Sequence, residues 1–313
     1  MRWIPTSFLI TLAAAGGLSA QVLTVDQAVD EAMTTNPAVQ AAEARAGAGV
    51  QRTKQAKGHR WGRLDLAETF NYSNNPAEVF ALTLNQGRFD FDEFFSSDPN
   101  NPAGISTWMT TLDLTLPIYT GGKIGTRVEQ AETMAGADEE TWRHTAELVA
   151  FETSTAYVNL AKARENVELL GKARQTTVEH VKLAEAYAKQ GIILEADVLD
   201  ARVYLSEMDD LLQQATSGAQ LAEAALNFHM GADQATPRSL APLPPPQSIT
   251  GELGDWTSAA VEKRHDLAAA RQQLAAGRLE TKAAKSGYLP EVAVVGRYGL
   301  YDDTIFGSNG HSG

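Results

Sequence analysis

One stretch of the sequence limits what this chain can fold into more than any other: residues 123–236 contain no proline. The stretch is rich in Ala, Glu and Lys, and apolar residues such as Val149, Ala156 and Leu160 recur at helical spacing. This composition is typical of a coiled coil or a long packed helix. A helix over residues 123–190 would be roughly 100 Å long at 1.5 Å per residue. The average globular helix has only about 11–12 residues.

A second helix is predicted to fold back along the first. The segment Gly191-Ile192-Ile193 interrupts the helical pattern, which resumes over residues 195–230 and ends at Gly231, a residue that commonly terminates helices. We therefore predict a long antiparallel helical hairpin over residues 123–231.

The predicted helix lengths suggest an elongated assembly. A first helical segment runs over residues 24–57, where Thr24 and Gln27 can form a capping box and Asn36-Pro37 interrupts the helix. This segment and the 195–230 helix are roughly 50 and 55 Å long, so together they match the one long helix. Two short helices stacked end to end beside one continuous helix suit a tube or a stalk.

The chain also repeats itself once. Residues 29–57 align without a gap on residues 257–285, and a Thr-Lys-x-Ala-Lys block is shared in register. We expect a first repeat over residues 21–236, a Pro-rich extended connector over 237–254, and an incomplete second repeat over 255–313.

Three segments alternate between apolar and polar residues and are predicted to be strands: 64–73, 108–118 and 290–301. Each has the length of a tilted transmembrane strand, although a half-buried strand of a soluble sheet has the same period and is favoured by periodicity alone. The segment between the first two strands, residues 74–106, is predicted to be a long loop rich in Asn, Pro, Asp and Phe.

The amino-acid composition argues against several classes of function. The chain has 313 residues and no cysteine, and 39 acidic residues against 26 Lys and Arg give a net charge of −13. Disulfides, zinc–thiolate sites and cysteine nucleophiles are excluded, and the acidic balance argues against a nucleic-acid partner. The mean hydropathy of −0.24 argues against a helical membrane protein. Residues 1–20 combine Arg2, a short apolar run and small residues up to Ala20, which is typical of a secretory signal peptide.

No catalytic, metal or cofactor site is predicted. Six histidines are scattered along the chain without the spacing of metal ligands: His59, His144, His180, His229, His265 and His311. Gly121-Gly122-Lys123 lacks the first glycine and the final Ser/Thr of a phosphate-binding loop, so a strand-to-helix turn is the better interpretation.

Short motifs, taken in order, resemble the TolC family of outer-membrane efflux proteins. The matching segments are Leu23-Thr24 with Ala28, Ala32 and Asn36-Pro37; Leu114-Thr115-Leu116-Pro117-Ile118-Tyr119-Thr120-Gly121-Gly122-Lys123; Gln190-Gly191-Ile192 with Asp197-Val198-Leu199; Leu226 with Met230-Gly231; Arg264-His265-Asp266-Leu267; and Gly287-Tyr288-Leu289-Pro290-Glu291-Val292. Together they cover nearly all of the chain after residue 20.

The resemblance implies a mainly α fold with membrane β-strands. A homotrimer would form a periplasmic α-helical tunnel from the hairpins and a shared 12-stranded transmembrane β-barrel in outer-membrane lipid. The expected function is a passive exit duct for a tripartite efflux pump or for type I secretion, working with a periplasmic adaptor protein and an inner-membrane pump. No enzymatic activity, cofactor or nucleic acid is implied.

The resemblance also implies roles for particular residues. The hairpin tip, with Gln190, Gly191, Ile192, Leu194 and Asp197, would contact the adaptor. A second group of residues would form the strand-to-helix turn: Pro117, Gly121 and Gly122.

The sequence departs from the family pattern in three places. His265 stands where the family usually has proline, and Trp61-Gly62 replaces the usual Leu-Pro. The fourth strand and the second helix pair are missing, so we expect a C-terminally truncated chain with three of the four strands. The alternative function is a periplasmic adaptor with a coiled-coil hairpin, a class that lacks such alternating strands.

Overall fold

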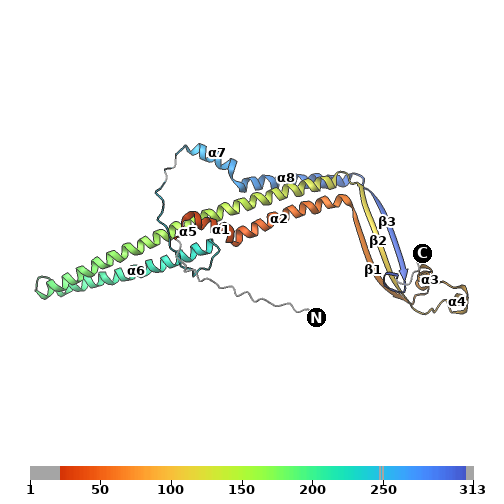
Figure 1. Ribbon diagram of the computed structural model, residues 1–313, viewed down its shortest axis with the longest axis horizontal. Coiled ribbons are helices and arrows are strands. Elements are labelled where there is room, and N and C mark those ends of the chain that lie inside the picture. Colours follow the sequence, from red (N-terminus) through yellow and green to blue (C-terminus); the bar gives the residue numbers. More distant parts are fainter. Residues whose placement is uncertain (1–21, 247, 249, 308–313) are drawn as a thin grey trace, which may run out of the picture. The chain divides into compact units, whose positions relative to one another are not determined.

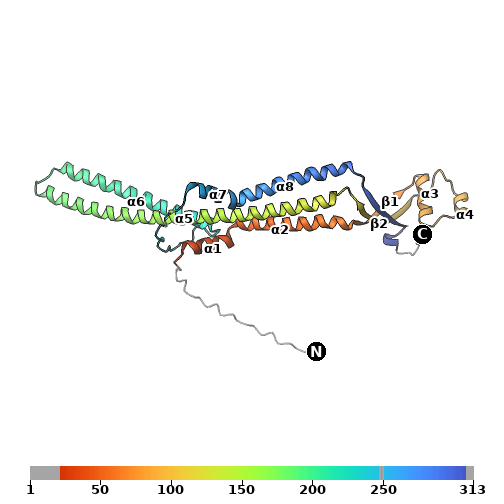
Figure 2. The same ribbon diagram turned by 90° about the horizontal axis from the view of Figure 1, so that it is seen from above.

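The computed structural model describes residues 22–246, 248 and 250–307 (Figures 1 and 2). The predicted signal peptide, residues 1–20, lies outside the described residues. The chain divides into two compact units. The first contains residues 22–44 and 141–264, and the second contains residues 45–140 and 265–307.

The predicted helical hairpin is confirmed. Helix α5 (Lys123–Lys189) is one continuous helix of 67 residues, which corresponds to about 100 Å. Helix α6 (Glu195–His229) runs back beside the second part of α5 in both views (Figures 1 and 2). Among the described helices, α5 included, none contains a stretch that is long and apolar enough to cross a membrane.

The core of the first unit lies where three helices meet. Helix α1 (Val25–Thr35) begins with the predicted capping box, in which Thr24 and Gln27 exchange hydrogen bonds of 3.1 and 3.2 Å. Its buried alanines pack onto α5 and α6, and small side chains allow this close approach. The main buried cluster consists of Leu23, Ala28, Ala156, Tyr157, Leu160, Leu226 and Met230.

The Pro-rich connector is held against the core. Leu23 forms a parallel β-bridge with Leu240, with hydrogen bonds of 2.7 Å from its amide to the Ser239 carbonyl and 2.8 Å to its carbonyl from the Ala241 amide. The buried Tyr157 hydroxyl donates to the carbonyl oxygens of Leu23 and Ala241 at 2.8 and 2.9 Å. Residues 239–241 of the connector are therefore extended and are an integral part of the first unit, whereas its predicted last residues, 253 and 254, belong to α7 (Leu253–Lys263).

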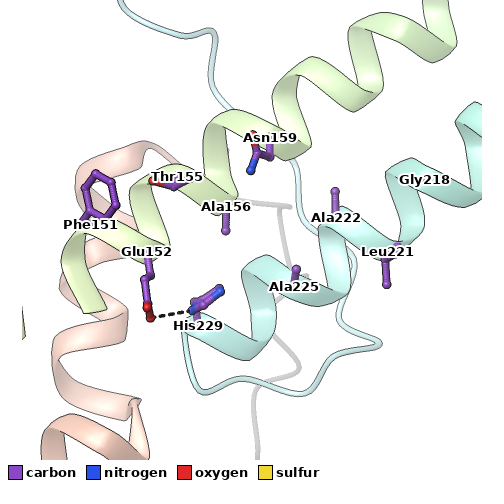
Figure 3. A pocket seen from close by; sticks show the side chains of 10 residues that line it. All are labelled: Phe151, Glu152, Thr155, Ala156, Asn159, Gly218, Leu221, Ala222, Ala225 and His229. Carbon is purple, nitrogen blue, oxygen red and sulfur yellow. Dashed lines mark ion pairs between the residues drawn. The ribbon is translucent and has the colours of Figure 1, made fainter. Parts of the chain in front are cut away.

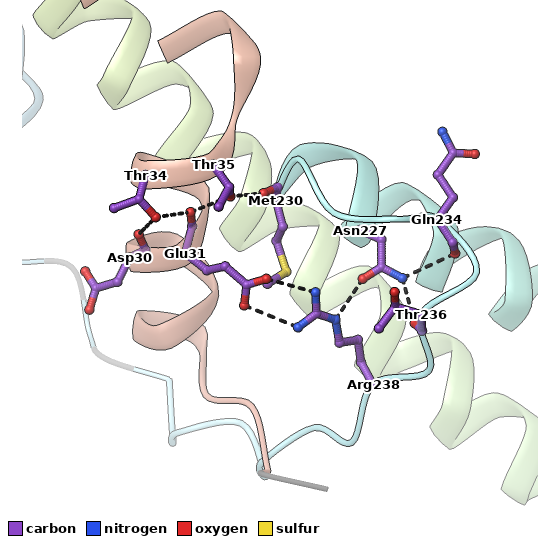
Figure 4. A network of polar contacts seen from close by, with 9 residues as sticks. All are labelled: Asp30, Glu31, Thr34, Thr35, Asn227, Met230, Gln234, Thr236 and Arg238. Atoms are coloured by element: carbon purple, nitrogen blue, oxygen red, sulfur yellow. Dashed lines mark hydrogen bonds and ion pairs between the residues drawn. The ribbon is translucent and has the colours of Figure 1, made fainter. Parts of the chain in front are cut away.

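A polar network joins the connector to α1 and α6 (Figure 4). The Arg238 guanidinium donates to both carboxylate oxygens of Glu31, at 3.0 and 3.2 Å, and to Asn227 Oδ1 at 2.8 Å. Asn227 is fully buried, and its amide nitrogen donates to the Thr236 carbonyl at 2.7 Å. Glu223 Oε1 accepts from the Arg238 amide at 2.7 Å. Because every buried polar group in this network is paired, the network orders the connector instead of destabilising the core.

Three long helical segments of the second unit lie side by side. The later part of α2 (Pro37–Gly58) and helix α8 (His265–Lys285) lie on either side of the first part of α5 (Figure 2). Ion pairs link α5 to both neighbours: Glu132 lies 2.8 Å from Lys57 of α2, and Glu129 lies 3.5 Å from Lys282 of α8.

The internal repeat is visible in the helix boundaries. Helix α7 (Leu253–Lys263) and α8 occupy the positions of α1 and α2 shifted by 228 residues. Arg264, between α7 and α8, has φ/ψ of −66°/118°, and Asn36, between α1 and α2, has −66°/122°. The helix break is thus kept even though His265 replaces the proline of the first copy.

The three predicted strands form one antiparallel sheet in the order β1-β2-β3: β1 (Arg63–Ser73), β2 (Ile105–Tyr119) and β3 (Val292–Asp302). A 3-10 turn (His59–Trp61) leads from α2 into β1, and another (Ser286–Tyr288) leads from α8 into β3. A last 3-10 turn (Ile305–Gly307) follows β3.

The prediction of a loop without secondary structure over residues 74–106 is wrong. The segment contains helices α3 (Pro76–Asn85) and α4 (Phe91–Ser96). Asn75 caps α3, with Pro76 as its first residue, and Asp90 caps α4 through bonds to the amides of Asp92 and Glu93. Five contacting phenylalanine rings hold the two helices together: Phe80, Phe89, Phe91, Phe94 and Phe95.

Candidate functional site

The hairpin tip is a tight turn built from backbone hydrogen bonds. The Gly191 amide donates to the Ala188 carbonyl at 2.9 Å, and the Ile192 amide donates to the Tyr187 carbonyl at 3.0 Å. This pair of bonds is a Schellman motif, which needs a left-handed residue, and Gly191 has φ +73°. The structure therefore brings the predicted tip residues Gln190, Gly191, Ile192, Leu194 and Asp197 into one turn.

The five tip residues do not have equivalent surroundings. Ile192 and Leu194 are 61% and 72% exposed, so the tip presents two large apolar side chains to its surroundings. The Asp197 carboxylate instead accepts a 3.0 Å hydrogen bond from the Leu194 amide and caps α6. Asp197 thus has a structural role at the start of α6, and the apolar pair is the better candidate for contact with another protein.

Ion pairs brace the hairpin behind the tip. Arg202 of α6 donates to Glu185 of α5 at 2.6 Å, and the Arg202 guanidinium lowers the pKa of the Glu185 carboxyl. Arg174 of α5 pairs with Asp209 of α6, and the hydrogen bond to this carboxylate raises the pKa of the guanidinium. These pairs are exposed to solvent and fix the register of the two helices more than they stabilise them.

The strand-to-helix turn lies between β2 and α5. Gly121 and Gly122 have φ +60° and +81°, so both adopt the left-handed conformation that glycine tolerates. A Cβ on Gly121 would lie 2.8 Å from the Leu289 Cβ, so the turn also needs glycine for close approach. Pro117 lies inside β2 and not in the turn. The pairing of β2 with β3 is irregular between Pro117 and Tyr119, because the proline nitrogen cannot donate to the ladder.

The two faces of the sheet have opposite character. On one face Leu66, Leu112 and Tyr298 lie directly opposite one another across the three strands, and the β1 residue Leu66 is 65% exposed. Glu68 is the one polar residue in the apolar pattern of β1, and its carboxylate accepts a 2.5 Å hydrogen bond from the Thr110 hydroxyl on this face. A large exposed apolar face marks a surface that is covered by lipid or protein in the working molecule.

The opposite face of the sheet is polar and charged. Asp65, Asp113 and Arg297 occupy one row across β1, β2 and β3, and Arg297 Nε lies 2.5 Å from Asp113 Oδ1. Arg63 pairs with Asp65 at 2.6 Å. A sheet with one apolar exposed face and one charged face can separate a hydrocarbon phase from water. The strands of a soluble sheet bury their apolar face, whereas the apolar residue Leu66 of this sheet is 65% exposed. The exposure therefore argues against the alternative of a soluble sheet.

An open groove between α5 and α6 was not predicted from the sequence (Figure 3). Its volume is about 470 Å³, and Phe151 and Leu221 stand exposed along it. His229 lies 3.5 Å from Glu152 at one end. The remaining lining is Thr155, Ala156, Asn159, Gly218, Ala222 and Ala225. Such an apolar, small-residue groove suits the packing of another helix.

The histidines occupy ordinary surroundings. His265 Nδ1 lies 2.6 Å from a Glu140 carboxylate oxygen, and His229 has the Glu152 partner already described. Within the described residues, no cluster of three or more His, Cys, Asp or Glu side chains could hold a metal ion. His311 lies outside those residues.

Comparison with known proteins connects these surfaces to one family. Over 140 residues, or 44% of this chain, the sequence is 33% identical to Protein CyaE of Bordetella pertussis (strain Tohama I), and the match spans 29% of that protein. The fold matches the outer membrane protein VceC of Vibrio cholerae with a TM-score of 0.66 and 19% identity, covering 91% of this chain and 64% of VceC. It matches the CmeC outer membrane channel of Campylobacter jejuni with a TM-score of 0.68 and 14% identity, covering 91% of this chain and 62% of CmeC.

The chain therefore spans less than two thirds of the length of these relatives. The family described as "Outer membrane efflux protein" matches residues 28–232, from α1 through the two strands and the complete hairpin. This match identifies the chain as a member of the outer membrane efflux protein family.

Proposed function

We propose that the protein is the passive outer-membrane exit duct of a tripartite efflux pump or a type I secretion system. The observation that carries the proposal is the combination, in one chain, of a two-faced antiparallel sheet and a helical hairpin based on a roughly 100 Å helix. Family membership puts the protein in the outer membrane, with its helical part in the periplasm.

The sheet supplies the membrane part of the duct. Its apolar face would contact outer-membrane lipid, and the row of Asp65, Asp113 and Arg297 would face water in the lumen. Because a lone three-stranded sheet has unpaired edges that lipid does not tolerate, several copies would have to close one shared barrel.

The helices would assemble as a homotrimer. The groove between α5 and α6, with Phe151 and Leu221 exposed, leaves apolar surface that a neighbouring copy would cover. Helices with water on both sides of a tunnel wall need such narrow apolar seams.

The hairpin tip would contact a periplasmic adaptor protein, which joins the duct to an inner-membrane pump. Ile192 and Leu194 provide the apolar contact, while Asp197 holds the turn in shape. The energy for transport would come from the pump, so we propose no enzymatic activity for this chain. The alternative, that the chain is itself an adaptor, is disfavoured because the family match includes the strands β1 and β2 as well as the hairpin.

An export assay tests the proposal. In the natural host, deletion of the gene should reduce export of the cargo of the cognate pump, and the wild-type gene should restore it. The double variant Ile192→Asp/Leu194→Asp should remain in the outer membrane and fail to restore export, because charges at the tip prevent apolar contact.

The matched control is Ile192→Val/Leu194→Ile, which keeps an apolar tip and should restore export. Full export by the aspartate variant would refute the role of the tip. Residence of the wild-type protein in the inner membrane would refute the duct itself.

A further inference from the structure

Residues of the segment between β1 and β2 line a cavity. Figure 1 shows this segment, with α3 and α4, at the end of the sheet opposite α8. The volume of the cavity is about 430 Å³, within the range of about 300–1,000 Å³ for small-molecule sites. The cavity is lined by residues of α3, of α4 and of the segments after them, together with Asp303 from the end of β3.

Three phenylalanines form an aromatic wall of this cavity. The ring centroid of Phe80 lies 5.3 Å from that of Phe89 and 5.6 Å from that of Phe94, and Phe89 and Phe94 are 5.5 Å apart. All three residues line the cavity. Rings in mutual edge and tilted contact form a stiff wall, which lowers the entropic cost of binding a ligand.

The charges around the cavity are mainly negative. Asp90, Glu93 and Asp303 line it against a single cation, Arg88, so three carboxylates less one guanidinium leave a formal charge of −2. Arg88 Nη1 lies 3.2 Å from Asp303 Oδ2, so this cation is paired. The Glu93 carboxylate is exposed to solvent and has no hydrogen-bond or ion-pair partner within the described residues. The cavity therefore combines an aromatic wall with an unpaired acid.

We propose that this cavity is a binding site for small organic cations that carry an apolar body. A quaternary or protonated amine would lie against the rings of Phe80, Phe89 and Phe94 and near the Glu93 carboxylate. Aromatic faces attract cations through their quadrupole, and the negative lining repels anions of the same size. The inference goes beyond the proposed duct, because it assigns a ligand site to the loop and not to the conduit.

Ligand binding to the purified protein in lipid nanodiscs tests this site independently of export. The probe is phenyltrimethylammonium, measured by saturation-transfer difference NMR with titration, and the comparison ligand is benzenesulfonate. We expect saturable binding of the cation and no saturable binding of the anion. Absence of cation binding, or equal binding of the two ions, would overturn the proposal.

Paired variants locate the site. Glu93→Gln and Phe80→Leu should each weaken cation binding by about three- to tenfold, since one removes the unpaired charge and the other the aromatic face. The control Glu78→Gln changes the same residue type as Glu93→Gln on α3 outside the cavity lining and should stay within about twofold of wild type. Equal effects of site and control variants would place binding elsewhere and refute the assignment.

Discussion

Replacement of Arg238 by methionine tests the most extensive polar network of the first unit. Methionine preserves most of the stem but removes three hydrogen bonds, two to Glu31 and one to Asn227. The bonds of the Arg238 backbone to Glu223 and Arg164 remain. The change is thus confined to the guanidinium, and it removes the links of this group to Glu31 of α1 and Asn227 of α6.

The expected cost follows from the burial of the two partners. Asn227 is 0% exposed, so its Oδ1 would be left buried without a donor, at about 1–3 kcal/mol. The Glu31 side chain is 36% exposed and can regain water, so loss of its ion pair adds at most about 1 kcal/mol. We expect Arg238→Met to destabilise the first unit by about 1–4 kcal/mol in total.

Hydrogen exchange read by mass spectrometry measures this effect locally. In Arg238→Met, the amides of Leu23 and Ala241, which form the β-bridge, should exchange faster by the factor that corresponds to this free energy, about fivefold or more. The matched control is Arg202→Met, which breaks the exposed pair with Glu185 and should cost about 0.5 kcal/mol or less. If the two variants change exchange in their own segments to the same extent, our account of the network is refuted.

Two further predictions concern the same unit. Gly231→Ala should destabilise the protein by more than about 1 kcal/mol, because Gly231 has φ +69° and an added Cβ would lie 2.6 Å from the Thr35 carbonyl oxygen. Gly218→Ala, at an open helical position, should stabilise it by about 0.5–1 kcal/mol. Chemical denaturation measures both changes in the free energy of unfolding, and changes of the same sign would contradict the structure. Burial raises the pKa of Tyr157 above its usual 10.0, so the stability that this phenol contributes is present below about pH 10 and is lost as pH rises through the folded-state value. Tyr157→Phe should therefore cost about 1–2 kcal/mol at neutral pH and flatten the alkaline decline in stability, and an unchanged decline would show that another group causes it.

Regular periodicity and helix-capping chemistry made most of the elements predictable from the sequence. The capping box at Thr24 is local, and the structure reproduces it. The break at Arg264 was not predicted, because no proline marks it, although the pattern of α1 and α2 recurs in α7 and α8. The tip turn was predictable for the same reason, since Gly191 terminates a long uninterrupted helix.

The prediction for residues 74–106 failed although local signals were present. Asn75-Pro76 is a good helix start, and Asp90 precedes Phe91, Phe94 and Phe95, which are spaced as on one side of a helix. Both helices are short, and isolated helices of this length are marginal, so only the contacts between the phenylalanines make them stable.

Contacts between distant parts of the chain were beyond reach of the sequence. Glu31 and Arg238 are 207 positions apart, and neither residue type nor spacing indicates that they meet. The apolar groove along Phe151 and Leu221 likewise arises only when α5 and α6 lie side by side. Pro117 was predicted to lie in the strand-to-helix turn but lies inside β2, and this position likewise depends on pairing with a distant strand, β3.

Labelling of single cysteines tests the central claim most directly, because the chain has no cysteine of its own. Asn100→Cys places a thiol in the loop after α4, and Gln190→Cys places one at the hairpin tip. An exit duct in the outer membrane predicts that a membrane-impermeant maleimide labels Asn100→Cys on intact cells and labels Gln190→Cys only after the outer membrane is opened. Equal labelling of both positions on intact cells, or labelling of neither until the inner membrane is lysed, would contradict the account.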